Sequence, residues 1–540
     1  MSDIEVARRS ASGSFILFAG NIISAAILAV TAVVVTRLLG PFDYGAYTLL
    51  LVLPLLLQSF VGLGINTGIT RYAALHLSKG EPEVARRMTL HGLIFVFVSG
   101  IVLFLVALSG SYYVSSFVLH RPELSGLSEV ACSLILVQTL FQSVNAALLG
   151  FGAMRPIGLS TIAQAAMKLV FSVSLILIGM GVLGAVLGQI VGLLVAGSLA
   201  GGVLYFRLPK RLATNGGTFA EDIREMFRYG LPVYIGGLAI TVAGQYVTIV
   251  LSAIANNVSV GYYMAAMNVV IVINSYLISA MATALFPAFA SLQGVRGDIR
   301  LAFGYSVQYM GYFIAPSLTF ALGAAGPLTR VLYGAAFVPA AGYLVLLSVA
   351  YLPLVMGLSA QTPFFNGVGL TRQLMYVNIA GAATIFVLAP LLSTVMGLGI
   401  PGLITTLFVS NLLMAVLGLA LATRRARAIV FFKPMVSTLA STLLALSAIL
   451  VVQLFVAEPF VALGVDIAVF LFVYLTAMPF LGGVRVADLE RLDAVIRGLG
   501  FFSRIILPIL AYERILIRSK ARAAAKKNTS SDERVSEQNS

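Results

Sequence analysis

Charged residues are scarce in this sequence, and acidic ones are almost missing from its apolar runs. Only 10% of the 540 residues are charged, whereas 60% are hydrophobic. A chain with so much apolar surface cannot hide it in a water-soluble core, so lipid must be its solvent. Asp466 is the one acidic residue well inside an apolar run, and it can lie at the outer end of its helix. Because proton or cation coupling commonly uses membrane-embedded carboxylates, this scarcity argues against a drug–cation antiporter.

Cysteine and histidine are also rare, which limits the chemistry that the chain can perform. A single cysteine, Cys132, excludes an intramolecular disulfide, and its apolar surroundings indicate a packing role. The three histidines are scattered and indicate no metal cluster: His76, His91 and His120. An enzyme that acts on activated sugars normally needs paired carboxylates, a metal site or a large extramembrane loop. None of these is evident, so we expect a protein that is not an enzyme and has no cofactor.

Acidic residues do occur in the longest internal loop, residues 207–228. Glu221, Asp222 and Glu225 alternate there with arginines at helical spacing. Mixed charge at this spacing is typical of a solvated amphipathic segment, so we interpret the loop as a linker without a catalytic role.

Positive charge is abundant, with a net value of +14, but it lies in short loops and in the C-terminal tail. Between long apolar runs such cations act as topology signals, so we expect no nucleic-acid partner. Placing the N-terminus in the cytoplasm leaves only three loop cations outside: Arg37, Arg121 and Arg330. An even number of spans brings the basic tail back to the cytoplasmic side. We therefore expect a multi-pass protein of the plasma membrane with both termini in the cytoplasm.

Long apolar runs follow one another along most of the chain, and each can cross the membrane as a helix of roughly 20 residues. They centre on residues 15–36, 45–65, 89–108, 128–150, 158–180, 183–206, 230–254, 262–286, 303–323, 341–360, 375–395, 401–423, 435–456 and 462–481. The first run is too long for a signal peptide and should remain as an anchor. The runs predict an all-α integral membrane protein with about 14 transmembrane helices, and the short gap at 180–182 is the least secure boundary.

The runs divide into two sets of six and a final pair, which predicts the domain organisation. The expected parts are an N-terminal six-helix lobe (1–206), a cytoplasmic amphipathic linker (207–228), a C-terminal six-helix lobe (229–423), transmembrane helices 13 and 14 (424–481) and a cytoplasmic amphipathic helix with a disordered basic tail (482–540). Two lobes with six spans each would be repeats of the same topology. The second run of each set opens similarly, with residues 45–47 (GAY) and 261–263 (GYY), although chance can also produce so short a match.

Lys168 is the clearest candidate for a functional charge, because it falls near the middle of the fifth run. An ionisable group at the centre of a membrane helix costs at least roughly 2.5 kcal/mol and is a functional candidate by default. Gln164 lies one turn away on the same face. If that face lines a hydrated cavity, Lys168 can bind a phosphate or diphosphate as a point charge. The alternative is a lysine that snorkels to the inner interface.

Amide side chains form a second group of candidates inside the runs. The first half contains Asn66, Gln138, Gln142 and Asn145, and the second half contains Asn268 and Asn274. Amides in hydrocarbon need partners, so they either bridge helices or face a hydrated path. Because amides both donate and accept hydrogen bonds, such a path would suit the hydroxyl groups of a sugar. Both alternatives remain open for each residue.

Several short motifs resemble those of a known group of transporters. They are residues 37–41 (RLLGP) with 44–47 (YGAY), and residues 62–64 (GLG) leading to 70–74 (TRYAA). Weaker similarities occur at residues 229–232 (YGLP), 260–263 (VGYY), 332–334 (LYG) and 337–340 (FVPA). Together they resemble the polysaccharide and oligosaccharide flippase branch of the multidrug/oligosaccharidyl-lipid/polysaccharide (MOP) exporter superfamily.

This resemblance implies a two-lobed transporter that moves polyprenyl-phosphate-linked or polyprenyl-diphosphate-linked oligosaccharide outward by alternating access. Its expected partners are that substrate, membrane lipids and a glycan polymerase or glycosyltransferases. Lys168 corresponds to a basic residue in the fifth span of family members. Arg37 and Arg71 match motif positions and are further candidates, although turn geometry or gating at the inner face is the simpler role for both. A multidrug or cation antiporter of the same fold is the alternative function.

Overall fold

The computed structural model describes residues 3–209, 217–273, 296–456, 458–484, 489 and 511–517. Within these residues the chain is helical and contains no β-strand, which confirms the predicted all-α class. Ten segments are long and apolar enough to cross a membrane, and several of them contain two or more consecutive helices. The described part of the chain is therefore that of a multi-pass membrane protein. The total of about 14 spans stays a prediction.

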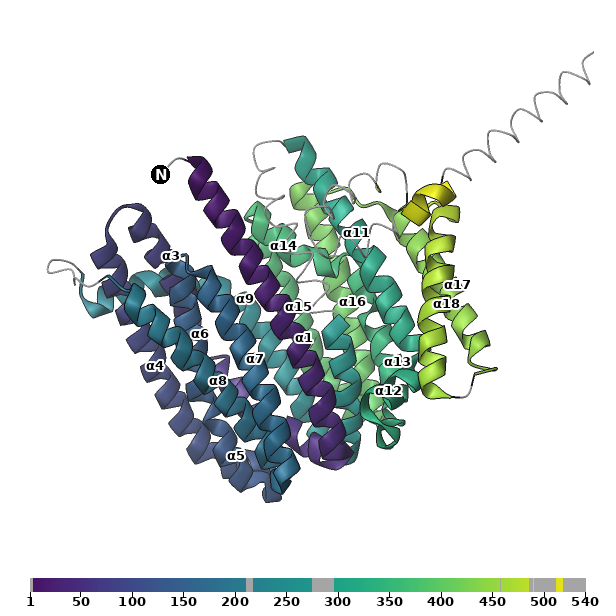
Figure 1. Cartoon of the computed structure of the whole chain (residues 1–540), viewed down its shortest axis with the longest axis horizontal. Helices are drawn as coiled ribbons and strands as arrows, with labels where there is room; N and C mark the ends of the chain where they lie inside the picture. The colour runs from purple at the N-terminus through teal and green to yellow at the C-terminus, as the bar shows by residue number, and fades with distance from the viewer. Residues whose placement is uncertain are drawn as a thin grey trace, which may run out of the picture.

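The first half of the chain forms one bundle, drawn in purple and blue in Figure 1. Its helices are α1 (Asp3–Leu50), α2 (Val52–Gln58), α3 (Ile65–Ser78), α4 (Pro82–Tyr113), α5 (Ser125–Cys132), α6 (Leu134–Gly150), α7 (Met154–Leu175) and α8 (Gly181–Arg207). Helices α7 and α8 pack along each other, and the chain reverses between them at Gly179 and Gly181, where φ is 98° and 50°. The structure therefore places a turn at the least secure of the predicted boundaries.

The second predicted span is a broken helix. It starts inside α1 after Gly40, whose φ of 73° and ψ of 174° interrupt the helix just before Pro41. It continues through α2 and a 3-10 turn, Val61–Gly64, before α3 begins. Gly64 there has a φ of 90°, a conformation that glycine adopts without a steric penalty. Discontinuous helices of this kind often border the substrate path of transporters, because their ends free backbone polar groups.

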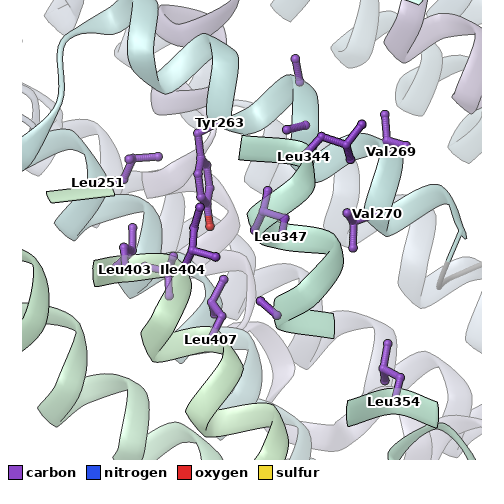
Figure 2. Close-up of a cluster of buried hydrophobic side chains, with 14 of the residues drawn as sticks. Leu251, Tyr263, Val269, Val270, Leu344, Leu347, Leu354, Leu403, Ile404 and Leu407 are labelled. Carbon is purple, nitrogen blue, oxygen red and sulfur yellow. The ribbon is translucent and has the colours of Figure 1, made fainter. Parts of the chain in front are cut away.

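The second half forms the green part of the molecule (Figure 1). Its helices are α9 (Phe219–Ile254), Asn257–Ile273, α11 (Arg296–Gly323), α12 (Ala325–Tyr333), α13 (Ala340–Tyr351), α14 (Leu358–Val368), α15 (Thr371–Pro390) and α16 (Gly399–Ala426). Figure 2 shows part of its buried core, where Leu251, Tyr263, Leu344 and Leu403 converge from different helices. Two further helices, α17 (Phe432–Val452) and α18 (Pro459–Phe480), pack together and against α11.

Helix α9 begins inside the segment that was expected to be a linker. Thr218 caps it: the Thr218 hydroxyl accepts a hydrogen bond from the Glu221 N–H, and the Glu221 carboxylate accepts one from the Thr218 N–H. These hydrogen bonds lower the pKa of Glu221. Asp222, one residue later, is buried and paired with Arg87 of α4. The prediction of a solvated segment was therefore wrong for Asp222, because its partner lies far away in the sequence.

Beyond Val484, the C-terminal tail is described only at Leu489 and in a short helix at residues 511–517. Tyr512 of this helix hydrogen bonds to Thr476 of α18, with 3.0 Å between the two hydroxyl oxygens. The rest of the predicted amphipathic helix and basic tail lies outside the described residues.

The two ends of the helix bundle differ in composition: one is rich in Lys and Arg, and the other contains closely packed glycines. The basic end includes the start of α1, at the top of Figure 1. It also includes Lys79, between α3 and α4, and Arg86, which donates a hydrogen bond to the carbonyl oxygen of Pro209 just after Arg207 at the end of α8. The glycine end, at the opposite side, carries Gly45 and the start of the helix Asn257–Ile273.

The two halves approach each other most closely at the glycine end. A Cβ atom added to Gly45 would lie 1.9 Å from the carbonyl oxygen of Asn257. Reciprocally, a Cβ atom added to Gly261 would lie 2.0 Å from the carbonyl oxygen of Pro41. Each glycine thus contacts the residue four positions before the other glycine. This is the reciprocal pattern of a two-fold contact, and it fits the repeat that the similar openings of the two second runs predict.

Candidate functional site

A cavity of about 490 Å³ opens in the first half, toward the basic end. Helices α1, α3, α6, α7 and α9 contribute its walls: Leu17, Asn66, Thr67, Thr70, Arg71, Asn145, Ala146, Leu149, Ile157 and Tyr229. The volume lies in the range of ligand-binding pockets. Three of these residues are predicted site residues, namely Asn66, Arg71 and Asn145. The structure therefore brings together amides and a cation from separate helices.

Arg71 supplies the positive charge of the cavity wall. Its guanidinium carbon lies 3.7 Å from the centre of the Tyr229 ring, a cation–π contact across two helices. No carboxylate lines the cavity or pairs with Arg71 in the described part of the chain. The guanidinium is exposed and keeps its fork of N–H donors for a planar or tetrahedral anion.

Neutral hydrogen-bonding groups surround this cation. The Asn145 side-chain oxygen accepts a hydrogen bond from the Ser160 hydroxyl at 3.0 Å, which orients the amide. Thr70 donates to the carbonyl oxygen of Ala146 at 2.8 Å and so joins α3 to α6. The side-chain oxygen of Asn66 is buried without a hydrogen-bond partner among the described residues. A buried acceptor of this kind is costly to leave unpaired, so the site favours a ligand or water with donors.

Local sequence explains why these helices meet. Asn66 and Thr70 are four residues apart and so lie on one face of α3, with Thr67 and Arg71 beside them. Gly150 ends α6 where a Cβ atom would lie 2.7 Å from the Cβ atom of Ala73. The missing side chain allows α6 to approach α3 and places Asn145 at the cavity.

Lys168 and Gln164 do not line this cavity. Both lie on the same stripe of α7 as the cavity residue Ile157, and Lys168 lies about 16 Å farther from the basic end. The Lys168 ammonium has no ion pair or hydrogen bond with any residue that the structure describes. Helix α8 packs closely behind it, because a Cβ atom on Gly192 would lie 2.9 Å from the Lys168 backbone nitrogen.

The two predicted glutamines of α6 extend the polar surface in the same direction. Gln138, Gln142 and Asn145 are spaced by four and three residues, so they share one stripe of α6 with the cavity residue Leu149. Gln142 is exposed and Gln138 is half-buried. The Ser160–Asn145 hydrogen bond joins α6 to α7 near the turn that connects them, whereas farther along both helices pack against α8.

The remaining predicted residues lie elsewhere. Asn268 donates a hydrogen bond to the Tyr44 hydroxyl and so bridges the two halves near the glycine end. Arg37 is exposed at that same end, where its Nε atom would lie 3.9 Å from a Cβ atom on Gly334. Asn274 falls outside the described residues. The structure therefore does not bring Asn268 or Arg37 to the cavity.

The sequence interpretation missed three polar residues of the cavity wall: Thr67, Thr70 and Tyr229. A signal existed for Thr70, which stands four residues after Asn66 and opens the TRYAA motif. Tyr229 opens the weaker YGLP motif at the start of the second half. Nothing in its local sequence shows that it lies against a helix of the first half.

Asp466 is the one acidic residue well inside an apolar run. It belongs to α18 and is fully buried where α18 packs against α17 and α11. One of its oxygens accepts a hydrogen bond from the Gln453 amide at 2.6 Å. Gln453 also donates to the carbonyl oxygen of Gly323, at the end of α11. Asp466 therefore belongs to the packing of the last two helices and not to the cavity.

Comparison with known proteins gives a family and a fold. A family model described as "Polysaccharide biosynthesis protein" matches residues 10–293. The chain is similar in structure to the lipid II flippase MurJ in an inward closed conformation, with a TM-score of 0.71 and 13% identity over 86% of this chain and 98% of that chain. No curated protein matches the chain.

Two transporters of the MOP superfamily show the same fold. An inward-facing multidrug resistance transporter of the MATE family has a TM-score of 0.64 and 16% identity over 75% of this chain and 94% of that chain. A MOP transporter from Pyrococcus furiosus, described by a binding pocket of reverse polarity, has a TM-score of 0.57 and 18% identity over 78% and 95% of the two chains. These likenesses and the family match confirm the resemblance that the motifs indicate. The chain belongs to the polysaccharide biosynthesis protein family and has the fold of the MOP superfamily.

Proposed function

We propose that this protein is a flippase for polyprenyl-phosphate-linked or polyprenyl-diphosphate-linked oligosaccharide. It moves this substrate from the cytoplasmic to the outer leaflet by alternating access, for the synthesis of a surface polysaccharide or glycoprotein. The observation that carries the proposal is the cavity wall, where Arg71 stands without an acidic partner among amides and hydroxyls. Such a lining attracts an anionic headgroup and repels a cation.

In this proposal each group binds a different part of the substrate. The phosphate binds first to Arg71, near the basic end, and then to Lys168, deeper along α7. Sugar hydroxyls hydrogen bond to Asn66, Asn145 and the glutamines of α6. The lipid tail stays in the bilayer, since its burial in a polar cavity would forfeit its contacts with other lipid chains.

The orientation follows from the distribution of loop cations. The basic end faces the cytoplasm, so the cavity receives substrate from the leaflet where lipid-linked sugars are assembled. The membrane is the plasma membrane, and the partners are glycosyltransferases that load the lipid and a polymerase that uses it. The glycine end faces outward and is closed in this conformation.

A multidrug or cation antiporter of the same fold is the alternative function. It is considered because a multidrug resistance transporter of the MATE family has a similar structure. A cation would need a carboxylate in its path. Among the described residues, no Asp or Glu lines the cavity, and Asp466 is packed elsewhere. The site therefore favours the anionic substrate.

Complementation of a strain that lacks its own surface-glycan flippase tests the proposal. Lys168→Ala and Arg71→Ala should each reduce surface glycan at least tenfold at unchanged membrane expression, because each removes a charged hydrogen bond. Lys168→Arg, which keeps the charge, is the matched control and should retain output. Full glycan output from both alanine variants would overturn the assigned site. Drug resistance that depends on Asp466 and an ion gradient would instead support the antiporter.

A further inference from the structure

We infer that Tyr229 is a positioning residue for Arg71, so that the two halves of the chain build the anion site together. Arg71 belongs to α3 of the first half, whereas Tyr229 belongs to α9, the first helix of the second half. The inference rests on the proposed function, because it assumes that Arg71 binds the phosphate of the substrate. According to this inference, the affinity of the site for phosphate depends on the docking of α9 on α3.

The Tyr229 ring fixes the guanidinium from one side. The Arg71 guanidinium carbon lies 3.7 Å from the centre of this ring, against 5.9 Å from the Tyr72 ring. Tyr72 in turn meets the edge of Tyr229 at a centroid distance of 6.5 Å. A flexible arginine loses rotamer freedom when it binds an anion, and a ring that already orients the guanidinium reduces this cost. The opposite face and the fork of donors stay available to the phosphate.

The basic-end part of α9 is held on the first half by several contacts. Asp222 pairs with Arg87 at 3.1 Å and with His91 at 2.7 Å, both from α4. Met226 lies so close to Gly68 of α3 that a Cβ atom there would meet the methionine Cβ atom at 2.6 Å. Tyr229 follows Met226 by three residues, which is about one helical turn. The contacts of Asp222 and Met226 therefore hold the Tyr229 ring against the guanidinium of Arg71.

A backbone contact completes this docking. A Cβ atom on Gly230 would lie 2.1 Å from the carbonyl oxygen of Gly64. The residue after Tyr229 therefore has to be very small for α9 to reach the 3-10 turn before α3. Tyr229 is thus fixed by the packing of its neighbours on both sides.

The later part of α9 belongs to the second half instead. Asn378 of α15 donates a hydrogen bond to the carbonyl oxygen of Gly236 at 3.1 Å. Tyr246 contacts Phe386 of α15 with a centroid distance of 4.8 Å. One helix is thus attached to α3 and α4 at one end and to α15 at the other. A movement of one half relative to the other therefore changes the position of the segment of α9 that carries Tyr229.

The consequence is a link between conformation and affinity. With α9 docked, Arg71 is oriented and the anion site is complete. When α9 leaves α3, Arg71 loses the ring and becomes a freely moving side chain, which binds phosphate more weakly. A ligand that prefers the docked state stabilises that state by the same factor. The site therefore releases the headgroup as the halves rearrange.

Binding of farnesyl diphosphate to the purified full-length protein tests the inference. Tyr229→Leu should weaken binding roughly three- to thirtyfold, the range of a cation–π contact. Tyr229→Phe keeps the ring and should bind as the parent does. In an Arg71→Ala background, Tyr229→Leu should cause no further loss, which a merely structural role of Tyr229 would not produce.

A remote variant keeps the inference testable if Tyr229→Leu folds poorly. Asp222→Asn leaves the cavity wall intact but weakens the docking of α9, so it should also reduce the affinity for farnesyl diphosphate several-fold. If Arg71→Ala binds normally, the proposed anion site itself is wrong. If Arg71→Ala binds weakly while Tyr229→Leu and Asp222→Asn bind normally, the site stands and the role of Tyr229 is overturned. Weak binding by Tyr229→Phe would also overturn it.

Discussion

The two ends of the molecule are held together in different ways. At the glycine end, Gly45 and Gly261 bring backbone against backbone, and a Cβ atom on either would lie within 2.0 Å of a carbonyl oxygen. At the basic end, one helix, α9, is attached next to a cavity, through side chains such as Asp222 and Arg87 as well as through the backbone contact of Gly230 with Gly64. At the glycine end Arg121 also donates hydrogen bonds to Asn257 and to the carbonyl oxygen of Ala255. That end is close-packed, whereas the basic end contains a cavity.

This difference indicates which end is suited to open and which to bind. A contact between backbones has no side chain that can adjust, so it is either fully made or fully broken. At the basic end, the exposed Arg71 side chain in the cavity wall can exchange water for ligand at small net cost. We therefore regard the glycine end as an all-or-none gate and the basic end as an adjustable binding surface.

The largest effect is expected at the basic end, from Asp222→Ala. Arg87 is only 13% exposed and would remain buried without its counter-charge, at a cost of roughly 3–5 kcal/mol. Thermal unfolding of the purified protein measures the loss. Arg224→Ala, an exposed arginine two residues away, is the control and should change stability little. A small effect of Asp222→Ala would mean that the ion pairs do not hold α9.

At the glycine end, Gly45→Ala should prevent the halves from closing. Its Cβ atom would overlap the carbonyl oxygen of Asn257, and overpacking of this kind costs roughly 1–3 kcal/mol. A cysteine at Ala265, fully buried one turn beyond Gly261 on the same face, reports the opening by its labelling with an impermeant maleimide. The background is Cys132→Ser.

The labelling rate should rise roughly 5- to 150-fold in Gly45→Ala. This is the increase in the population of the open state that corresponds to an overpacking cost of roughly 1–3 kcal/mol. The matched control is Gly326→Ala, a glycine near the same end where a Cβ atom would meet nothing within 4 Å. Equal rates in the two variants would contradict the idea of an all-or-none gate.

A smaller effect is expected from Tyr44→Phe, which removes the hydroxyl that accepts a hydrogen bond from Asn268. The half-buried amide would lose a partner across the gate, at a cost of roughly 1–2 kcal/mol. The same cysteine at Ala265 should then label faster than in the parent, but less so than in Gly45→Ala. No change would show that the hydrogen bond between Asn268 and Tyr44 does not help to close this end.

The sequence was sufficient to predict the all-α class and the long apolar helices, but it predicted no gate. Long apolar runs dictate helices in lipid, because every backbone group must be paired within its own segment. The similar openings at Gly45 and Gly261 predicted a repeat, and the structure places these two glycines in reciprocal contact. A small residue at the start of a span is a local signal, and local signals can be read without knowledge of the fold.

The site was less predictable, because it depends on contacts between distant segments. Asp222 looked solvated since Arg87 and His91 are more than a hundred residues away. Tyr229 gave no sign of lying beneath Arg71 for the same reason. Lys168 stood out by its position in a run, yet the cavity is lined by residues nearer the basic end. Hydropathy indicates how deep a residue lies in the membrane, but it does not show which face of a helix lines a cavity.

The smallest effect is expected from Thr218→Ala, at the first residue of the basic-end attachment. It removes the side-chain oxygen that caps α9, at a cost of about 1 kcal/mol, far less than the loss of the Asp222 pairs. Hydrogen bonding to Thr218 lowers the pKa of Glu221, so its stabilisation is present at neutral pH and is lost as the pH falls through that lowered pKa. Hydrogen exchange of the first turn of α9 should therefore be faster in Thr218→Ala than in the parent at neutral pH, and it should speed up on acidification in both, because the backbone N–H at position 218 still donates to Glu221. An equal exchange rate in both at neutral pH would mean that α9 is held at this end by Asp222 and its partners alone, and the cap would have no part in the attachment.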